Sequence, residues 1–275
     1  MDAMQWILRH RIFGWIVILA SGCLTSGGVA LGQEMYFGVI APLGELEGVI
    51  DKTVDTTDPG TLVPESRRGL RQNQASSGSR SEYGAGPVLG LRLRLPATGL
   101  FVAAEADAAW LDSSVHSQFD GIGDSPGRNQ LGEFWPDVWS YDAESSYGAT
   151  ARFGGNLPFL GPLGVDLYAL AGLRWIDGTF TNSTFGCLSP IPCSEAADTP
   201  NFAASSGSRD IGFGGTVIGV GLESSLGALV LRAELRQTRY DTEAWVTPFT
   251  DIRVTVPTAL DIEQSELVVG AIWTF

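Results

Sequence analysis

Short runs in which apolar residues alternate with small or polar residues recur along this chain, and they constrain its fold more than any other feature. Alternation with a period of two is typical of β-strands, because successive side chains of a strand point to opposite faces of the sheet. The eight runs span residues 35–43, 87–95, 100–111, 147–157, 165–180, 213–223, 229–240 and 266–275. The pattern therefore predicts an all-β protein.

The connections between the runs alternate strictly between short and long. The short ones are 96–99, 158–164 and 224–228, each with the glycine or proline of a tight turn. The long ones are polar and span 44–86, 112–146, 181–212 and 241–265. In an antiparallel up-and-down sheet, this order places every short turn at one end and every long loop at the other. Barrels of bacterial outer membranes sort their connections in this way, whereas a soluble β-sandwich has no reason to do so. We therefore predict an eight-stranded antiparallel up-and-down transmembrane β-barrel.

Within the runs, charged side chains keep to one parity and large apolar side chains to the other. In the run 229–240, for example, Leu231 and Leu235 alternate with Arg232 and Arg236. The charged parity carries six arginines and five acidic residues, so the two signs nearly balance. These residues are Arg92, Arg94, Glu105, Asp107, Arg152, Asp166, Arg174, Glu223, Arg232, Glu234 and Arg236. We expect them to form a charge network in the interior of the barrel.

Two orientations of the strands satisfy this pattern. With the apolar face inward, the chain would be a soluble barrel with an apolar cavity, like a lipocalin. With the apolar face outward, it would meet lipid, and the charged residues would pair inside. We favour the second orientation, because closure leaves no unpaired amides in lipid and because the charged parity also holds small residues that suit a narrow interior. Four aromatic residues fall at the expected height of an aromatic girdle: Trp110, Tyr147, Trp175 and Tyr240.

The N-terminal segment 1–32 has the pattern of a secretory signal peptide. Arg9 and Arg11 precede the apolar run 12–20, and the small residues before Gln33 resemble a cleavage site. We therefore expect the barrel domain to span residues 33–275. The alternative is a lipoprotein box at 19–23, in which Cys23 would be lipidated and become the new N-terminus.

Charge and cysteine content agree with export. Removal of residues 1–32 leaves 15 basic residues (17 minus 2) and 30 acidic residues (31 minus 1), a net charge of −15. A nucleic-acid partner would need a basic face, so we expect none. Cys187 and Cys193 remain, and in an oxidising compartment we expect them to form a disulfide within the third long loop. No histidine stands near them to complete a metal site, and we expect neither metal nor cofactor.

The last strand, 267–275, alternates apolar residues, has Trp273 two positions before the end and finishes on Phe275. It resembles the C-terminal signature of bacterial outer-membrane proteins, which the outer-membrane assembly machinery is thought to read. The segments 169–175, 219–223 and 232–236 extend this resemblance to the OmpA-like, OmpX-like family of eight-stranded barrels. The peptidoglycan-binding domain that OmpA itself carries after its barrel is not expected here.

The resemblance implies a non-enzymatic envelope protein of the bacterial outer membrane. We expect it to support envelope integrity or surface contact through long acidic loops, with membrane lipid and lipopolysaccharide as partners, and to be a monomer. A small gated pore controlled by the interior charges is a further expectation, although large side chains should fill so narrow a lumen. The alternatives are a small-solute channel and a lipid-modifying barrel enzyme. A catalytic site would have to use His116 with Ser117 and Asp112, which is a weak arrangement, so we predict no catalytic residues.

Overall fold

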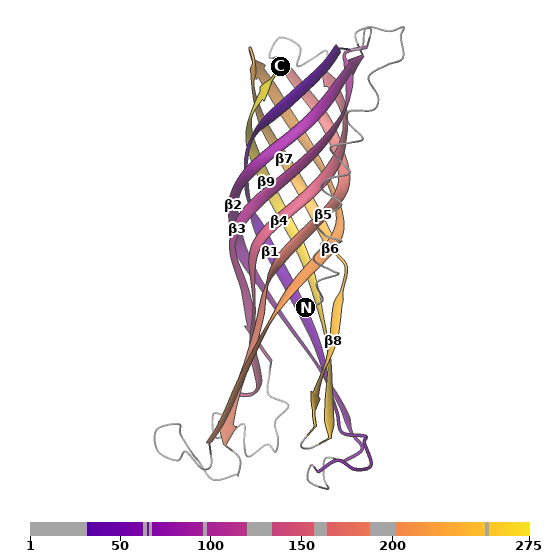
Figure 1. Ribbon diagram of the computed structural model, residues 1–275, viewed down its shortest axis with the longest axis vertical. Helices are drawn as coiled ribbons and strands as arrows, with labels where there is room; N and C mark the ends of the chain where they lie inside the picture. The colour runs from indigo at the N-terminus through magenta and orange to yellow at the C-terminus, as the bar shows by residue number, and fades with distance from the viewer. Residues whose placement is uncertain are drawn as a thin grey trace.

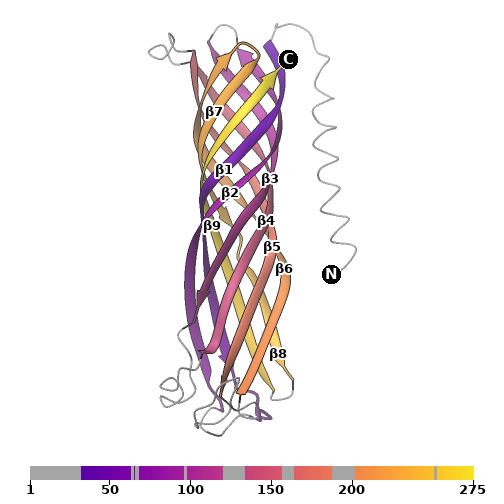
Figure 2. The same cartoon turned by 90° about the vertical axis from the view of Figure 1, so that its left-hand side faces the viewer.

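The protein is a single antiparallel β-barrel closed through eight strands (Figures 1 and 2). The computed structural model describes residues 32–62, 65, 68–95, 98–119, 134–156, 164–187, 202–250 and 253–275. Its strands are β1 Gly32–Asp55, β2 Arg71–Leu95, β3 Leu100–Gln118, β4 Phe134–Asn156, β5 Val165–Cys187, β6 Phe202–Leu226, β7 Leu229–Tyr240, β8 Glu243–Phe249 and β9 Val254–Thr274. None of the described residues forms a helix long and apolar enough to cross a membrane.

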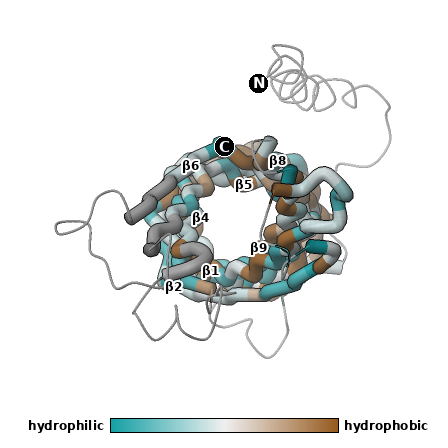
Figure 3. The backbone as a smooth tube through the Cα atoms, turned by 90° about the horizontal axis from the view of Figure 1, so that it is seen from below, coloured by the Kyte–Doolittle hydropathy of each residue, from teal (hydrophilic) through white to brown (hydrophobic). Residues whose placement is uncertain are grey.

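The strands β1 to β7 pair in sequence order, and β9 pairs with both β7 and β1 to close the ring (Figure 3). The prediction of an all-β antiparallel barrel with eight strands in the ring is therefore confirmed. A ninth strand, β8, pairs with residues 254–260 of β9 and continues the line of β7. The predicted loop 241–265 is thus wrong, because most of it is this β8–β9 hairpin.

The strands are much longer than the alternating runs predicted. The predicted loop 44–86 is strand over its two ends, 44–55 and 71–86, and the loops 112–146 and 181–212 are also largely strand. The connections that remain at the loop end are 56–70, 119–133, 188–201 and 250–253. These segments were missed because serine, glycine and charged residues occupy their outer face, and such residues have little β-propensity of their own. Pairing with neighbouring strands along the whole length overrides that preference.

The turn-end half of the barrel wears an apolar band on its outer face. Large apolar side chains stand there exposed: Met35, Phe37, Val39, Leu43, Leu89, Val102, Phe153, Leu167, Leu173, Ile218, Val220, Leu222, Leu231, Leu235, Leu267 and Val269. On β3 the band runs from Leu100 to Trp110. At a rise of about 3.3 Å per residue and a tilt of about 40°, these positions span roughly 25 Å along the barrel axis.

Beyond the band, the polarity of the barrel wall inverts. We call this part the extension; it comprises residues 44–55, 71–82, 111–118, 134–146, 176–187, 202–215, 243–249 and 254–266. Its outer face carries exposed polar residues, among them Glu45, Glu47, Asp51, Ser77, Ser79, Ser81, Glu144, Asp210 and Thr255. Its inner face holds the largest apolar cluster among the described residues, which includes Leu46, Ile50, Val115, Trp139, Tyr141, Ile176, Phe180, Phe213, Leu260 and Ile262. The banded half therefore has its apolar face outward and the extension has its apolar face inward, so both orientations considered from the sequence occur in one barrel.

The extension is also less completely closed than the banded half. The β2–β3 ladder ends at the pair Tyr83–Asp112, and the β6–β7 ladder ends at the pair Gly215–Tyr240. Among the described residues, no ladder pairing continues across these two seams. The strands β3 to β6 and the strands β2, β1, β9 and β8 therefore form two sheets that separate toward the loop end (Figure 1). The apolar cluster lies between them, as in a β-sandwich.

Candidate functional site

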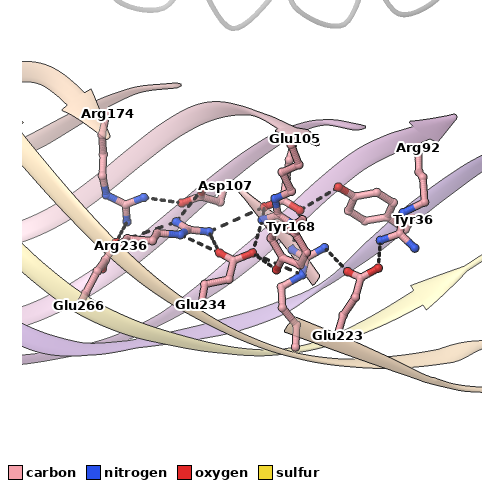
Figure 4. Close-up of polar contacts among 12 residues, drawn as sticks. Tyr36, Arg92, Glu105, Asp107, Tyr168, Arg174, Glu223, Glu234, Arg236 and Glu266 are labelled. Carbon is pink, nitrogen blue, oxygen red and sulfur yellow. Dashed lines mark hydrogen bonds and ion pairs between the residues drawn. The ribbon is translucent and has the colours of Figure 1, made fainter. Parts of the chain in front are cut away.

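Ten of the eleven predicted interior charges are buried inside the banded half of the barrel, and Arg94 is partly exposed at its turn end. Figure 4 shows the centre of this group. Strand alternation explains their position, because each occupies the parity opposite the apolar band. Glu105 of β3 pairs with Arg152 of β4 and accepts a hydrogen bond from Nη1 of Arg232 at 2.6 Å. The hydroxyl of Tyr36 donates at 2.9 Å to Oε2 of the same carboxylate, the oxygen that Arg232 also contacts. Glu105 is therefore held by three donors from three different strands.

A second centre forms around Asp107 and Glu234. Asp107 receives Arg174 at 2.9 Å and Arg236 at 3.3 Å. Glu234 accepts a hydrogen bond from Nε of Arg236 at 2.7 Å and pairs with Arg152 at 2.8 Å. Nearer the turn end, Arg94 pairs with Asp166 at 2.7 Å. Charge-assisted bonds of this kind are short and strongly oriented, so the network fixes the relative positions of the strands it joins.

Several ion pairs of the network cross the barrel from one wall to the opposite wall, among them the pair of Arg236 of β7 with Asp107 of β3. Arg92 of β2 contacts Glu223 of β6, and Arg232 of β7 contacts Glu105 of β3. In a ring of eight strands, β2 faces β6 and β3 faces β7. The guanidinium of Arg92 also lies 4.5 Å from the ring centroid of Phe101. Side chains therefore obstruct the lumen at this height, as a barrel of this size allows.

Sequence reasoning missed several members of the network. Glu266 lies 3.8 Å from Arg174 and 3.9 Å from Arg236, and Glu34 lies 3.4 Å from Arg94. Tyr168 donates a hydrogen bond to Glu234. Glu266 stands on the charged parity of the last strand, so parity alone could have found it. Glu82 is also buried, but it lies in a segment predicted to be loop.

The apolar cluster of the extension caps the network on its loop-end side. Trp139 is 1% exposed, and its Nε1 donates to Oγ of Ser76 at 3.1 Å, which bridges the β2–β3 seam. Across the β6–β8 seam, the guanidinium of Arg209 lies 4.9 Å from the ring centroid of Trp245. Trp139 belongs to an aromatic segment that we predicted as loop, whereas it lies within β4. Side chains rather than backbone ladders thus join the two sheets.

The aromatic girdle is partly as predicted. Trp110 is 71% exposed at the edge of the band, and Tyr147 stacks on Trp175 with 5.7 Å between ring centroids. The prediction for Tyr240 is wrong, because its side chain points inward and its hydroxyl donates to Gln264 at 2.7 Å. Tyr240 has the same parity as Arg232 and Arg236, and that parity faces the lumen. Tyr83, which is exposed on the outer face, was missed.

The predicted assembly signal lies where β9 meets β1. Trp273 and Phe275 both stack on Phe37, at centroid distances of 5.8 Å and 5.5 Å. The amide of Phe275 donates to the carbonyl of Met35 at 3.0 Å. The terminal residues therefore help to close the ring. Whether assembly machinery reads them stays a prediction.

The weak catalytic arrangement is not assembled. His116 is exposed on the outer face of β3, and the hydroxyl of its neighbour Ser117 bonds Ser76 across the seam at 3.1 Å. Asp112 accepts a hydrogen bond from Tyr83 instead. Consecutive residues of a strand point to opposite faces, so His116 and Ser117 cannot act on one substrate.

Two further predictions lie outside the described residues. They are the signal segment 1–32, apart from Gly32 at the start of β1, and the disulfide, since Cys193 and the side chain of Cys187 are not described. Both stay predictions.

Comparison with solved structures finds similarity to several proteins that include the following three, all at low TM-scores. The first is Ail, the attachment invasion locus protein of Yersinia pestis, in a complex with a heparin analogue (14% identity, 86% of this chain and 99% of that chain, TM-score 0.29). The second is the outer membrane protease OmpT of Escherichia coli (10% identity, 91% and 100%, TM-score 0.39). The third is Neisserial surface protein A (12% identity, 85% and 97%, TM-score 0.30). No protein-family model and no curated protein matches the sequence. Likeness at this level assigns no activity.

Proposed function

We propose that this chain is a non-enzymatic bacterial outer-membrane protein that anchors through its banded half and presents its extension and loops outside the cell. The observation that carries the proposal is the inversion of wall polarity at the end of the band. An exposed apolar band about 25 Å high matches the hydrocarbon layer that a transmembrane barrel occupies. In water, such a band would be an aggregation liability.

The inversion of wall polarity indicates that the outer face of the barrel meets lipid in one part and water in the other. In the banded half, the exposed residues are apolar and the charges are buried, which suits lipid outside. In the extension, most apolar residues are buried and most exposed residues are polar, with Val49, Val246 and Phe249 as exposed exceptions, which suits water outside. On β1, the extension runs from Gly44 to Asp55, which corresponds to roughly 30 Å along the axis at the same rise and tilt. The loops would therefore stand well above the membrane surface.

This geometry favours surface contact as the working role. The extension has many acidic residues on its outer face, including Glu45 and Glu47 directly beyond the band on β1. At that height they would face the phosphate-rich head groups of lipopolysaccharide, and we expect divalent cations of the medium to screen the repulsion. A rigid, water-exposed support for loops is typical of proteins whose loops carry the function. Envelope contact, with a monomeric barrel as the anchor, is the function that fits best.

Accessibility on intact cells tests the proposed orientation. Ser79→Cys places a thiol on the outer face of the extension, and Thr98→Cys places one in the short turn between β2 and β3. A membrane-impermeant maleimide should label the first variant on intact cells and the second only after lysis, with the parent chain as the control for its own cysteines. Labelling of both variants, or of Thr98→Cys alone, would refute the proposed topology. Heat-modifiable gel migration of each variant should confirm that the barrel has folded.

The charge network supports a second candidate, a small gated conductance. The pairs Arg92–Glu223 and Arg232–Glu105 cross the lumen, so conduction requires them to break. In planar bilayers, trimming the loop 56–70 should leave any such conductance unchanged, because the obstruction lies in the banded half. Binding of cell-surface or matrix material should instead be lost on trimming. Conductance with intact binding after trimming would favour the channel over surface contact.

A further inference from the structure

Two acidic side chains face each other over a glycine at the boundary between the charge network and the apolar cluster. Gly44 of β1 pairs with Glu82 of β2 on one side and with Glu266 of β9 on the other. Both carboxyl groups lie inside the barrel, at 2% and 4% residue exposure. A side chain on Gly44 would clash, because its Cβ would stand 2.9 Å from Cβ of Glu266. No side chain of β1 therefore separates the two carboxyl groups.

The two carboxyl groups differ in their partners. Glu266 has Arg174 and Arg236 within 4 Å. Within the described part of the chain, no arginine or lysine forms an ion pair with Glu82, which receives one hydrogen bond from the amide of Gln264. The hydroxyl of Tyr240 fixes the orientation of that amide by donating to its oxygen at 2.7 Å. Oε2 of Glu82 is buried and has no hydrogen-bond partner.

The charges of the lumen do not balance if every carboxyl group is ionised. Among the described residues, seven carboxyl groups are buried there: Glu82, Glu105, Asp107, Asp166, Glu223, Glu234 and Glu266. Six arginines of the described chain accompany them: Arg92, Arg94, Arg152, Arg174, Arg232 and Arg236. Lys52 is not one of this group, because its Nζ lies 5.5 Å from the ring centroid of Phe119 in the apolar cluster of the extension. Seven minus six leaves one excess negative charge, before Glu34 at the turn end is counted. An uncompensated buried charge is so unfavourable that such groups usually become neutral.

The surroundings of Glu82 identify it as the carboxyl group that becomes neutral. The titratable and polar groups that face it are Glu266 and Gln264 of β9, Arg174 of β5, Tyr240 of β7 and Tyr141 of β4. Of these, only Arg174 is positive, and it is already engaged by Asp107 and Glu266. A second carboxylate nearby disfavours the charged form of Glu82 further.

We propose that Glu82 is a proton-binding site of the lumen, whose carboxyl group is neutral when the arginines have paired with the other six. The proton balances the interior charge and lets the network end against the apolar cluster. Release of this proton places an unpaired negative charge beside Glu266 at that boundary. The folded barrel therefore binds one proton more than the unfolded chain between the acidic range and neutrality, so its stability falls as the pH rises through that interval.

Infrared spectroscopy of the folded protein in detergent tests the site directly. A folded sample in neutral deuterated buffer should show the carbonyl stretch of a protonated carboxylic acid, and Glu82→Gln should remove this band. Absence of the band from the parent protein would overturn the proposal, as would its persistence in Glu82→Gln. This measurement needs no comparison of stabilities and so does not depend on how well a variant folds.

A matched pair of substitutions gives a second readout. Glu82→Gln replaces a neutral acid with a neutral amide, so it should change the unfolding rate at neutral pH by less than about threefold. Glu105→Gln removes a carboxylate that two arginines contact, so it should raise the unfolding rate by at least about tenfold. Between about pH 5 and neutrality, the parent should lose stability more steeply than Glu82→Gln. Equal effects of the two substitutions would refute the assignment. If sodium stabilises the parent protein more than a bulky organic cation does, a metal cation rather than a proton balances the charge, and the proposal is overturned.

Discussion

A depth series of arginine substitutions offers the sharpest test of the lipid-facing band. Val220 and Leu226 of β6 lie in the band, and Val246 of β8 lies on the outer face of the extension. Their side chains are similarly exposed, at 53%, 61% and 58%. Exposure alone therefore predicts the same small effect at all three positions, so any difference reports the surrounding medium.

The expected magnitudes follow from the position of each residue along the barrel. Val220 stands midway between Leu226 at the turn end and Gly214, which pairs with Trp175 of the girdle. Val220→Arg should therefore sit near the bilayer midplane and cost about 2–4 kcal/mol of folding free energy, while Leu226→Arg near the interface should cost about 0–1 kcal/mol. Val246→Arg, with water on its outer face, should change stability by no more than about 0.5 kcal/mol.

Reversible unfolding in lipid vesicles, followed by tryptophan fluorescence over a denaturant series, measures all three values on one scale. The unfolding slope should be the same for each variant, so that the midpoint reports stability. The reasoning fails if Val220→Arg and Val246→Arg differ by less than about 1 kcal/mol, because the band would then not face lipid. A larger cost at Val246 than at Val220 would invert the proposed orientation of the barrel.

Three further outcomes follow from the structure. Glu105→Ala should destabilise the folded barrel by about 3–5 kcal/mol, because it leaves two buried arginines without their carboxylate partner. Arg239→Ala breaks the exposed pair with Glu263 and should cost at most about 1 kcal/mol. Equal losses of stability in the same vesicle assay would contradict a buried network. Burial lowers the pKa of Lys52, the single lysine of the chain, to about 8, so the pH profile of its acylation rate should have its midpoint near that pH. The stability of the folded barrel should rise as the pH increases from there to the pKa of an unfolded lysine, because over that interval Lys52 is protonated only in the unfolded chain. An acylation midpoint above about pH 10 would show that Lys52 is not buried. Phe275→Ala should slow folding into vesicles and lower the free energy of unfolding by about 0.5–1.5 kcal/mol, because the stacking contact with Phe37 is lost. An unchanged stability would show that this contact does not stabilise the barrel.

The banded half of the barrel was predictable because its sequence alternates cleanly. Leu231 and Leu235 on one parity and Arg232, Glu234 and Arg236 on the other leave a single arrangement that buries the charges and exposes the apolar residues. The short turns at 96–99 and 224–228 then fixed antiparallel neighbours. Glu266 also lies on the charged parity of the last strand, so the same pattern could have predicted it as an interior charge.

The extension was not predictable in the same way. On β2, Ser77, Ser79 and Ser81 face outward with small or polar residues between them, so the local sequence has neither an apolar face nor high β-propensity. These residues form strand because β1 runs alongside them from Tyr83 to Arg71 and satisfies their backbone groups. Long-range pairing of this kind has no local signal.

By itself, the sequence determined that the chain has two-faced strands, short turns at one end and balanced charges on one parity. Only the tertiary structure decided how far the strands continue, where the wall exchanges apolar for polar residues, and that Glu82 and Glu266 meet over Gly44. The physical reason is that a period of two separates the faces of a strand without naming the medium each face meets. That medium depends on height along the closed barrel, which is a property of the whole ring.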